Sequence, residues 1–373
     1  MRICLLIRAL NFGGAQRQIV ALANGLAQGG HTVTVAVYYP NGGLEEFLDS
    51  KVKLCSLDKS GRWDIFSFFY HLALLIRNES PDLVYSFMED SNSINVCLKP
   101  FYSGRKVVWG VRHSFMDLQK YEWIDRAYEI IERRLSKFAD QIIFNSYAGI
   151  TLAVHNGYPA QKSCVIPNGI DANYFTPNAQ ARIDKRKEWG IPEKDHLIGI
   201  VGRLDPMKDH VTFLRAANQL IKMNPQARFV CVGDGPVSYR EKLQKTSDSL
   251  DLIERVLWVG NQQNMPSVYN ALDIMVSSSS YGEGFSNVIG EAMSCGLPCV
   301  ITDVGDSALI VGNMGKVVPP CAPQALAAGI EEMITLLKNI DHEKIRARVL
   351  ENFGINNMVN QTEDVLLSVL KNG

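Results

Sequence analysis

Short apolar runs alternate with amphipathic stretches along the first half of the chain. Runs of strand length occur at residues 3–7, 32–38, 83–87, 106–111 and 141–145. Between them, apolar residues recur at helical spacing over residues 15–28, 63–77 and 121–137. Strands that alternate with helices in this way predict a doubly wound parallel sheet.

A second alternation follows a break in the pattern. Pro167, Gly169, Pro177 and a charged stretch at 182–188 interrupt the periodicity, and we interpret this part of the chain as a linker. Strands are then expected at 197–201, 228–232, 256–259, 274–277 and 299–302, and helices at 209–223, 238–249, 265–271 and beyond 323. The sequence therefore predicts two α/β domains, with a deep cleft between their strand ends that can hold two substrates.

The segment 281–298 places two carboxylates, Glu283 and Glu291, around a glycine-containing turn and a helix start. Apolar runs flank the segment, so it reads as the strand-to-helix corner of a βαβ unit. Parallel sheets bind ligands at such corners, where unpaired backbone amides attract phosphate oxygens. The residues that supply these amides here are Gly284, Phe285, Ser286 and Asn287.

The two glutamates have a functional and a structural interpretation. About one turn into the helix, Glu291 can accept hydrogen bonds from two ribose hydroxyls, while Glu283 on the loop would face the transferred group. Alternatively, Glu291 only interacts with the helix dipole, which contributes roughly 0.3–1 kcal/mol, and Glu283 is a solvated loop acid.

Two cations follow the first strand of the second half. Arg203 and Lys208 stand in the loop Gly202-Arg-Leu-Asp-Pro-Met-Lys-Asp-His210, which leads into a helix. An arginine fork and a lysine point charge together can neutralise a diphosphate, and would stabilise it as a leaving group. The alternative is that both are solvated loop residues.

Composition narrows the class of protein. The chain has 373 residues and a net charge of −1, with no basic excess that would indicate a nucleic-acid partner. Eight cysteines are scattered through apolar runs without metal-ligand spacing, so we expect reduced core residues in a cytoplasmic protein. The chain opens directly on a strand, which predicts that there is no signal peptide, and no apolar run approaches the length of a membrane span.

One stretch has a second interpretation that involves a membrane. The most apolar stretch, 63–76, favours a core-packed helix, but it could also lie on a lipid surface. The neighbouring stretch 99–137 holds nine basic against five acidic residues, which favours contact with anionic lipid at the inner face of the plasma membrane.

Five motifs in this order resemble those of the family 4 retaining glycosyltransferases. They are Phe12-Gly-Gly-Ala-Gln-Arg17, Ile166-Pro-Asn-Gly-Ile-Asp171, Gly202-Arg-Leu-x-Pro-x-Lys208, Gly233-Asp-Gly-Pro236 and Glu283-Gly-Phe-x4-Gly-Glu291-Ala-Met-x-Cys-Gly-x-Pro298. The resemblance covers nearly the whole chain and implies the GT-B fold of two facing Rossmann-like domains. It places an acceptor-side domain at 1–168 and a nucleotide-sugar domain at 169–351, with a helix over about 352–373 returning to the first.

The resemblance also implies roles for particular residues. Glu283 would contact the donor sugar, the amides of Gly284 to Asn287 would hold sugar and phosphate, and Glu291 would bind the ribose. Arg203 and Lys208 would hold the diphosphate in place of a metal, so neither metal nor cofactor is expected, and the chain shows no clear Asp-x-Asp signature.

The first domain contributes further candidates. Gly13 and Gly14 allow close approach of the backbone next to a helix start, near the donor phosphate and the acceptor in the family's arrangement. Arg17, in the first turn of that helix, is unfavourable for the dipole and so suggests anion binding. Gln16 replaces a glutamate found in many relatives, which leaves its role open. His113 follows a strand and, with Arg112 as a weaker candidate, is expected to position donor sugar and acceptor hydroxyl.

The resulting hypothesis is sugar transfer from a nucleoside diphosphate to an acceptor hydroxyl. Retention comes from the resemblance alone. We expect front-side attack, in which the departing phosphate oxygen accepts the acceptor proton and Glu283 positions the substrate. The expected donor is a UDP-hexose or UDP-N-acetylhexosamine, GDP-mannose being next. The acceptor is expected to be a growing glycan of lipopolysaccharide or exopolysaccharide.

Other function classes were weighed against this one. A sugar-nucleotide epimerase of the same architecture and a non-catalytic nucleotide-binding module remain as alternatives. A glycoside hydrolase is disfavoured because one carboxylate is assigned to the ribose. A dehydrogenase is disfavoured because the first loop lacks the full Gly-x-Gly-x-x-Gly.

Overall fold

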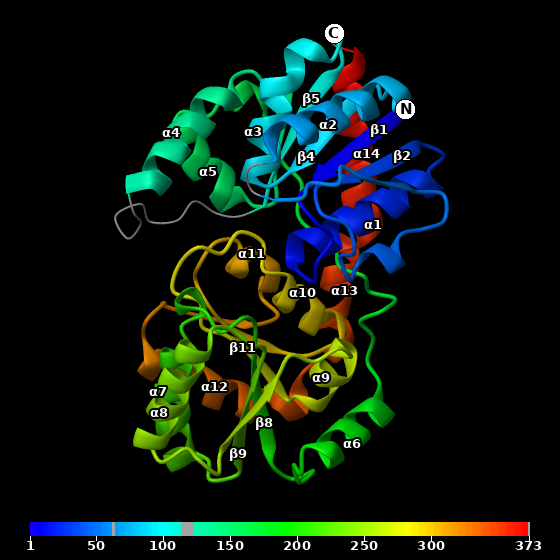
Figure 1. The fold of residues 1–373 in the computed structure, drawn as a ribbon. Coiled ribbons are helices and arrows are strands. Elements are labelled where there is room, and N and C mark those ends of the chain that lie inside the picture. The colour runs from blue at the N-terminus through cyan, green and yellow to red at the C-terminus, as the bar shows by residue number, and fades with distance from the viewer. Residues whose placement is uncertain (62–63, 113–122, 372–373) are drawn as a thin grey trace. The chain divides into compact units, whose positions relative to one another are not determined.

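The computed structural model describes residues 1–61, 64–112 and 123–371. The chain divides into two compact units (Figure 1). Unit 1 comprises Met1–Gly169 and Ile355–Gly373, and unit 2 comprises Ile170–Gly354. Each unit has its own parallel sheet with helices on both faces, as expected where buried strands alternate with helices.

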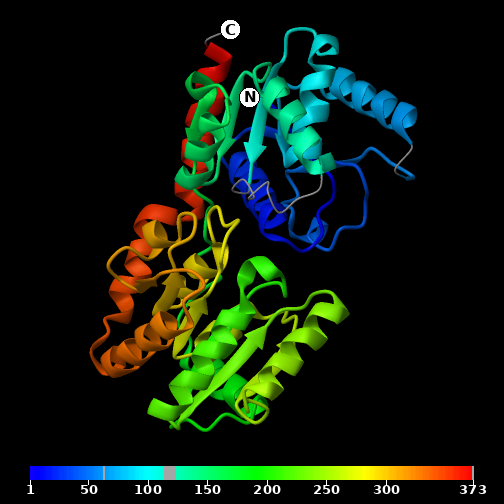
Figure 2. The same cartoon turned by 90° about the vertical axis from the view of Figure 1, so that its left-hand side faces the viewer.

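Unit 1 has a seven-stranded sheet in the order β3-β2-β1-β4-β5-β6-β7. The strands are β1 (Arg2–Ile7), β2 (Thr32–Val37), β3 (Lys53–Ser56), β4 (Leu83–Phe87), β5 (Lys106–Val111), β6 (Gln141–Phe144) and β7 (Ser163–Val165). The helices are α1 (Gly14–Gln28), α2 (Ile65–Glu79), α3 (Glu89–Leu98), α4 (Trp123–Ser136), α5 (Tyr147–His155) and α14 (Ile355–Lys371). Helix α14, red in Figure 2, runs along unit 1 and packs against α1.

Unit 2 has a six-stranded sheet in the order β10-β9-β8-β11-β12-β13. Its strands are β8 (His196–Val201), β9 (Ala227–Val232), β10 (Val256–Gly260), β11 (Ile274–Ser277), β12 (Cys299–Thr302) and β13 (Lys316–Val318). Its helices are α6 (Ala179–Glu188), α7 (His210–Met223), α8 (Val237–Ser249), α9 (Met265–Ala271), α10 (Asn287–Ser294), α11 (Ser307–Val311), α12 (Pro323–Leu336) and α13 (His342–Phe353).

Both sheets reverse their strand order at one place. In unit 1 the chain builds outward from β1 on one side and then continues from β4 on the other, and in unit 2 the same holds for β8 and β11. We call the carboxyl ends of β1 and β4 the unit 1 switch point, and those of β8 and β11 the unit 2 switch point. Parallel sheets bind ligands at such places because the loops on the two sides diverge there.

Most of the predicted elements are confirmed, and the missed ones have physical reasons. Strands β3, β7 and β13 are edge strands and are partly exposed, so they lack a continuous apolar run. Helix α3 buries Ser91, Asn92 and Asn95, so its inner face does not show apolar periodicity. Helices α5 and α11 were also missed.

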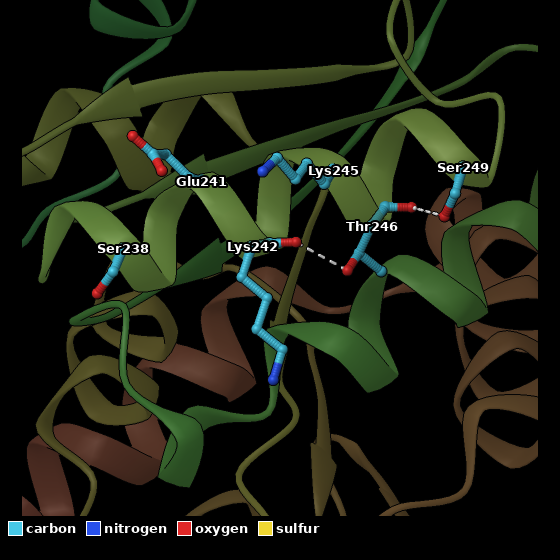
Figure 3. A pocket seen from close by; sticks show the side chains of 6 residues that line it. All are labelled: Ser238, Glu241, Lys242, Lys245, Thr246 and Ser249. Carbon is cyan, nitrogen blue, oxygen red and sulfur yellow. Dashed lines mark hydrogen bonds between the residues drawn. The ribbon is translucent and has the colours of Figure 1, made fainter.

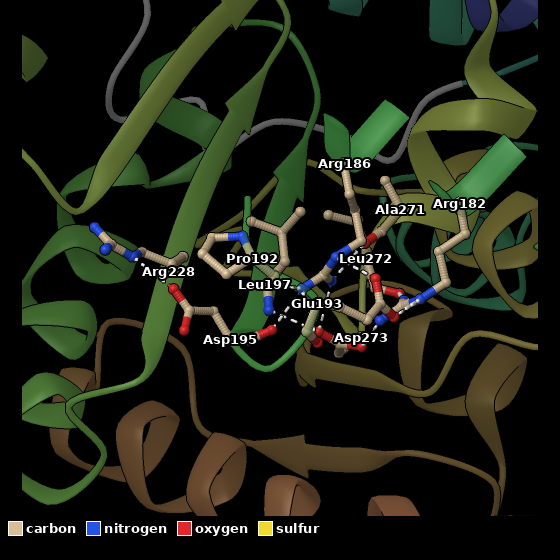
Figure 4. A network of polar contacts seen from close by, with 10 residues as sticks. All are labelled: Arg182, Arg186, Pro192, Glu193, Asp195, Leu197, Arg228, Ala271, Leu272 and Asp273. Atoms are coloured by element: carbon tan, nitrogen blue, oxygen red, sulfur yellow. Dashed lines mark hydrogen bonds and ion pairs between the residues drawn. The ribbon is translucent and has the colours of Figure 1, made fainter. Parts of the chain in front are cut away.

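The interpretation of 182–188 as part of a linker is wrong. These residues belong to α6, which begins after Asn178, whose side chain accepts a hydrogen bond from the Ala181 amide. Arg186, on this helix, is fully buried and donates to Asp273 and to four backbone carbonyl oxygens, those of Ala271, Pro192, Glu193 and Asp195 (Figure 4). The charged stretch 182–188 is therefore helical, and the buried guanidinium of Arg186 holds the helix against the rest of unit 2.

Asp273 connects this anchor to the sheet. Asp273 lies just before β11 and also accepts a hydrogen bond from the Arg182 side chain at 2.9 Å (Figure 4). It accepts a further hydrogen bond of 2.7 Å from the amide of Leu197, at the start of β8 (Figure 4). Both strands of the unit 2 switch point are thus held at their amino ends by one carboxylate.

The described part of the hydrophobic stretch 63–76 belongs to α2 from Ile65 onward, which packs in the core as favoured. Phe68, Leu72 and Ile76 of α2 are buried in a cluster with Leu6 and Trp109. All eight cysteines lie in the described residues and are free. The expectation that they are core residues holds for Cys4, Cys231, Cys295 and Cys299. Cys55 and Cys164 are partly buried, and Cys97, near the end of α3, and Cys321, in the loop between β13 and α12, are exposed.

Candidate functional site

The unit 2 switch point brings together two loops that the sequence separates by about seventy residues. The first loop follows β8 and runs to Asp209, and the second follows β11 and runs to Ser286. Every predicted donor-binding residue of the second half lies on these loops or on the first turns of α10.

The loop after β8 is shaped by two aspartates. Asp205 accepts a hydrogen bond from the Met207 amide at 3.0 Å and caps a single 3-10 turn, Pro206–Lys208. Asp209 adopts a left-handed conformation and caps α7 by accepting from the Thr212 amide and hydroxyl. These caps fix the backbone on both sides of Lys208.

Lys208 and Glu283 form an ion pair across the two loops. Their side chains are only 17% and 7% exposed. The Ser279 hydroxyl donates to the same carboxylate at 2.6 Å. Glu283 is therefore a buried, hydrogen-bonded acid, and its interpretation as a solvated loop acid is wrong.

Three consecutive serines hold the two loops together. Ser278 donates through its hydroxyl to the Lys208 carbonyl at 2.8 Å, and the Ser280 amide donates to the Met207 carbonyl at 2.8 Å. Ser279 completes the set through Glu283. Since the serines fix the backbone at Lys208 as well as the acid that faces it, they preorganise the pair.

The loop that carries Glu283 is supported from behind by the segment after β12. The Asp306 amide donates to the Gly284 carbonyl at 3.1 Å. Gly305 has φ +61°, and a Cβ there would collide with the carbonyl groups of Glu283 and Gly284. The close approach requires glycine and leaves the loop little freedom to shift.

The start of α10 carries the predicted phosphate-binding amides, Gly284 to Asn287. Phe285 anchors this turn in the core of unit 2 and contacts Phe353. The Ser286 hydroxyl is buried and has no hydrogen-bond partner among the described residues. A buried hydroxyl beside a helix N-terminus, without a partner of its own, suits a ligand oxygen.

Glu291 lies in the second turn of α10, close to the predicted position. It is 5% exposed and accepts a hydrogen bond of 2.7 Å from the Tyr269 hydroxyl of α9. The tyrosine holds one carboxylate oxygen, which orients the group. A role limited to the helix dipole does not require such burial, because desolvating a carboxylate costs free energy unless partners compensate.

Arg203 differs from Lys208. Its side chain is 69% exposed and pairs with Asp205 at 2.8 Å. The structure places it on the same loop but gives it freedom to reorient, in contrast to the fixed lysine.

His210 follows the loop and was not predicted. It is fully buried, and neither ring nitrogen has a hydrogen-bond partner among the described residues. Burial, with a smaller contribution from the positive charge of Lys208, lowers the pKa of His210 to about 4. The imidazole is therefore neutral at physiological pH.

The candidate residues of unit 1 make few contacts that bear on ligand binding. Gly13 precedes α1 in extended conformation, and Gly14 begins that helix, as expected. Arg17 is exposed in its first turn. Arg112 stacks on Phe87 and donates to Tyr85 and Asn168, so it has a structural role. His113 lies outside the described residues.

A surface hollow elsewhere in unit 2 lacks the arrangement of side chains that a ligand pocket needs. It follows one side of α8, as Figure 3 shows, and is lined by Ser238, Glu241, Lys242, Lys245, Thr246 and Ser249. The Thr246 and Ser249 hydroxyls donate to carbonyl groups of their own helix. Without convergent polar groups or apolar walls it does not resemble a substrate pocket.

The described residues hold neither a metal-binding cluster nor a membrane-spanning helix. No group of three or more His, Cys, Asp or Glu side chains is arranged to hold a metal ion there. None of the helices in the described ranges is long and apolar enough to span a lipid bilayer.

Sequence reasoning missed the groups that support the site. The signal for Ser278, Ser279 and Ser280 was present as a run of four serines directly after a buried strand. Tyr269 gave no signal, because its contact with Glu291 depends on how α9 packs against α10.

Comparison with known proteins agrees with this geometry. The glycosyl transferases group 1 family matches residues 181–349, and the Glycosyltransferase Family 4 domain matches residues 12–174. A putative glycosyltransferase, EpsF, from Bacillus subtilis is 24% identical over 81% of this chain and 79% of its own length. An Escherichia coli UDP-Gal:alpha-D-GlcNAc-diphosphoundecaprenol alpha-1,3-galactosyltransferase is 29% identical over 57% of this chain, and the chain spans about half the length of that relative.

Solved structures show the same fold. HepE of Anabaena in complex with UDP-glucose superposes with a TM-score of 0.86 at 23% identity, over 99% of this chain and 100% of that one. A sucrose-phosphate synthase from Thermosynechococcus elongatus has a TM-score of 0.87 at 20% identity, over the full length of both chains. With two Rossmann-like units, a preorganised Lys208–Glu283 pair and family matches along both halves, this chain belongs to the family 4 glycosyltransferases and has the GT-B fold.

Proposed function

We propose that the protein is a retaining glycosyltransferase that uses a UDP-sugar and needs no metal ion. The observation that carries the proposal is the Lys208–Glu283 pair at the unit 2 switch point, with the buried Glu291 and the unpartnered Ser286 hydroxyl beside it. In this proposal Glu291 binds the ribose, Arg203 and Lys208 bind the diphosphate, and Glu283 binds the sugar.

The ion pair is compatible with both predicted roles. A lysine ammonium has three donors and a carboxylate has two oxygens that accept several hydrogen bonds. Lys208 can therefore keep one bond to Glu283 while donating to phosphate oxygens, and Glu283 can accept from sugar hydroxyls. Their contact fixes each group for its own ligand, which lowers the ordering cost on binding.

In the proposed reaction the bond between the sugar's anomeric carbon and the diphosphate breaks as the acceptor oxygen attacks from the same face. The departing phosphate oxygen accepts the acceptor proton. Negative charge grows on the diphosphate, where Lys208, Arg203 and the amides at the start of α10 stabilise it. Glu283 holds the sugar and does not act as base or nucleophile.

The choice of donor follows from relatives. The Escherichia coli relative is named for a UDP-galactose donor, and HepE of Anabaena was solved with UDP-glucose. We propose a UDP-hexose or UDP-N-acetylhexosamine as donor. The acceptor would be a glycan of a cell-surface polysaccharide or lipopolysaccharide, reached from the cytoplasmic face of the membrane.

A thermal-shift experiment tests the donor proposal. UDP-glucose, UDP-galactose, UDP-N-acetylglucosamine and GDP-mannose are compared in the presence of EDTA. A donor at 100 times its Kd stabilises the folded protein by about 2.7 kcal/mol. This corresponds to a Tm increase of about 5–10 °C for a unit of this size. A shift that appears only after a divalent cation is added would contradict metal independence.

The same samples separate the alternative functions. Incubated alone, the donor is converted to another sugar nucleotide by an epimerase, but is at most slowly hydrolysed by a transferase. A non-catalytic module gives the thermal shift without release of UDP in the presence of any acceptor.

A further inference from the structure

The carboxylate of Glu283 has one oxygen that carries its contacts with the protein. Lys208 and the Ser279 hydroxyl both donate to Oε1, the serine at 2.6 Å. No hydrogen bond to Oε2 is made within the described residues. A carboxylate accepts several hydrogen bonds, so Oε2 keeps its full capacity for the hydroxyls of a ligand. The position of Ser279 therefore helps to decide where this second oxygen lies.

Ser279 lies beyond the end of its strand and is held there by a side chain. The ladder between β11 and β12 ends with Ser277 opposite Ile301. Past this point, the Ser279 carbonyl accepts a hydrogen bond of 2.6 Å from the hydroxyl of Thr302. The same hydroxyl lies 3.2 Å from the Ser277 carbonyl. The threonine thus continues the contact between the two strands beyond the end of their backbone ladder.

Thr302 is itself in a rigid position. It is the last residue of β12, pairs with Val318 of β13 and is 1% exposed. Its β-branched side chain has restricted freedom at χ1. Its buried hydroxyl keeps its hydrogen bond, because a buried polar group without a partner costs free energy. Thr302 and Ser279 therefore form a fixed link from β12 to the Glu283 carboxylate.

The segment that begins with Thr302 also holds the far end of the Glu283 loop. Gly305 packs closely against the carbonyl groups of Glu283 and Gly284, and the Asp306 amide donates to the Gly284 carbonyl. Residues 302–306 thus contact the loop 279–284 at both ends. A shift of the carboxylate along the loop would break one of these contacts, so the loop has a single supported position.

We propose that Thr302 is a positioning residue for sugar transfer, which acts through Ser279 to hold the Glu283 carboxylate where Oε2 accepts hydrogen bonds from the donor sugar. The Thr302 hydroxyl donates to backbone carbonyls and does not act on the substrate itself. This inference rests on the proposed function, in which Glu283 binds the sugar. Because the groups assigned to ribose and diphosphate do not bond to Thr302, losing its hydroxyl should affect the sugar and spare the nucleotide.

The chain contains a matched control in unit 1. Thr362 of α14 is also 1% exposed, and its hydroxyl donates to the Met358 carbonyl at 2.7 Å. Thr302→Val and Thr362→Val therefore make the same chemical change. Each replaces a buried hydroxyl, bonded to a backbone carbonyl, by a methyl group of similar size. Thr302→Ser keeps the hydroxyl and tests rescue by a conservative change.

Steady-state kinetics and titration calorimetry with the full chain test the proposal. For Thr302→Val we expect kcat to fall about 10–100-fold, because displacing a positioned group by about 1 Å can cost this much. The Kd for the preferred UDP-sugar should rise about fivefold, as for one weakened hydrogen bond, while the Kd for UDP stays unchanged. Thr302→Ser should recover most of the lost kcat, and Thr362→Val should keep the wild-type kcat and both Kd values.

A double variant shows whether Thr302 acts through Ser279. Ser279→Ala removes the bond to Glu283, so adding Thr302→Val to it should lower kcat little further. Losses that multiply in the double variant would contradict this route. If Thr302→Val does not fold, Thr302→Cys takes its place with the same expectations, since a thiol is a weak donor.

Three results overturn the inference. These are a Thr302→Val protein that behaves like Thr362→Val, equal weakening of UDP and UDP-sugar binding, and multiplied losses in the double variant. Failure of the proposed function looks different, because wild type would then transfer no sugar from any nucleotide-sugar. Thr302 would then be judged by binding alone. A rise in Kd for the UDP-sugar but not for UDP would support its role in positioning Glu283, and the absence of such a selective rise would overturn it.

Discussion

The two switch points use the same strand topology to build opposite kinds of ion pair. Lys208 and Glu283 are almost enclosed and are held by Ser279 and by backbone contacts on both sides. In unit 1, Arg8 directly follows β1 and Asp90 lies just after β4. Their side chains are 66% and 40% exposed and approach to 4.0 Å. A charge that must stabilise a leaving group benefits from a fixed, poorly solvated position, because its interaction with developing charge is stronger there. The Arg8–Asp90 pair lacks this enclosure. The two units therefore build ion pairs of different burial on the same strand topology.

Replacing Lys208 with methionine should have the largest effect on turnover. The change removes the charge that we propose to act on the diphosphate and keeps the length of the side chain. Loss of one preorganised electrostatic contact typically lowers kcat by about 10²–10³-fold, or about 3–4 kcal/mol of transition-state stabilisation. Steady-state kinetics with the preferred UDP-sugar measure this.

The control for Lys208→Met is a double variant. Because the single change leaves Glu283 buried without its partner, it also lowers the free energy of unfolding. Lys208→Met/Glu283→Gln restores a neutral pair, so its urea midpoint should recover towards wild type while kcat stays low. If kcat recovers together with the midpoint, the lysine acts only through the fold.

His210 should make the unit 2 switch point sensitive to acid. Its pKa is about 4 in the folded protein, against 6.5 when exposed. Below pH 6.5 the unfolded chain binds a proton that the folded protein does not, so the free energy of unfolding falls as pH drops from 6.5 towards 4. The loss amounts to about 3 kcal/mol at the lower end.

Urea unfolding at pH 7 and pH 4.5 tests this, with His210→Leu as the comparison. Leucine fills a similar volume and needs no hydrogen bond, so it should be tolerated at pH 7. The acid-induced loss should be smaller in His210→Leu than in wild type by most of this amount. Parallel pH dependence in the two proteins would show that other groups are responsible.

Glu291→Gln should weaken donor binding more than it slows the chemistry. In the proposed function the Glu291 carboxylate accepts from two ribose hydroxyls, and an amide cannot replace it there. Loss of a charged hydrogen bond costs about 1.5–3 kcal/mol, or about 10–150-fold in Kd. Titration calorimetry with UDP measures the change. Tyr269→Phe is the matched control, since it frees one carboxylate oxygen without removing the charge, and its effect should be smaller.

The fold could be predicted well because most helices and strands are determined by the residues within them. Apolar runs and helical periodicity identify most elements of both units, and the order of strands and helices fixes the parallel topology. The positions of Glu283 and Glu291 followed from the helix start between two such runs. What could not be predicted depends on partners brought together by the fold. The seventy-residue separation between Lys208 and Glu283, the burial of Arg186 and the hydrogen bond from Thr302 to the Ser279 carbonyl leave no trace in local pattern.

The interpretation of 99–137 as a membrane-binding stretch stays a prediction. The described residues there include the exposed Phe101, and Phe138 follows directly after the stretch. Flotation with vesicles that contain anionic lipid, at low and at high salt, measures the contact. Salt should release the protein if basic residues hold it, because screening reduces the attraction within a Debye length. Equal flotation with neutral vesicles would contradict an electrostatic contact.

The smallest effect is expected on the stability contributed by the Arg8–Asp90 pair. Exposed pairs contribute about 0–1 kcal/mol, so Asp90→Asn should leave the urea midpoint nearly unchanged. The same is expected for Asp82→Asn, which breaks the Arg2–Asp82 pair at the amino ends of the same two strands. Met88, in the turn before Asp90, has φ +74° and is held through Gly110, which bonds the Met88 amide and the Asn92 side chain; the substitution touches none of these groups. An unchanged midpoint would show that the exposed pair contributes little to the stability of unit 1. A marked fall in the midpoint would instead mean that the open pair supports the strained turn, and the contrast between the two switch points would then be one of degree.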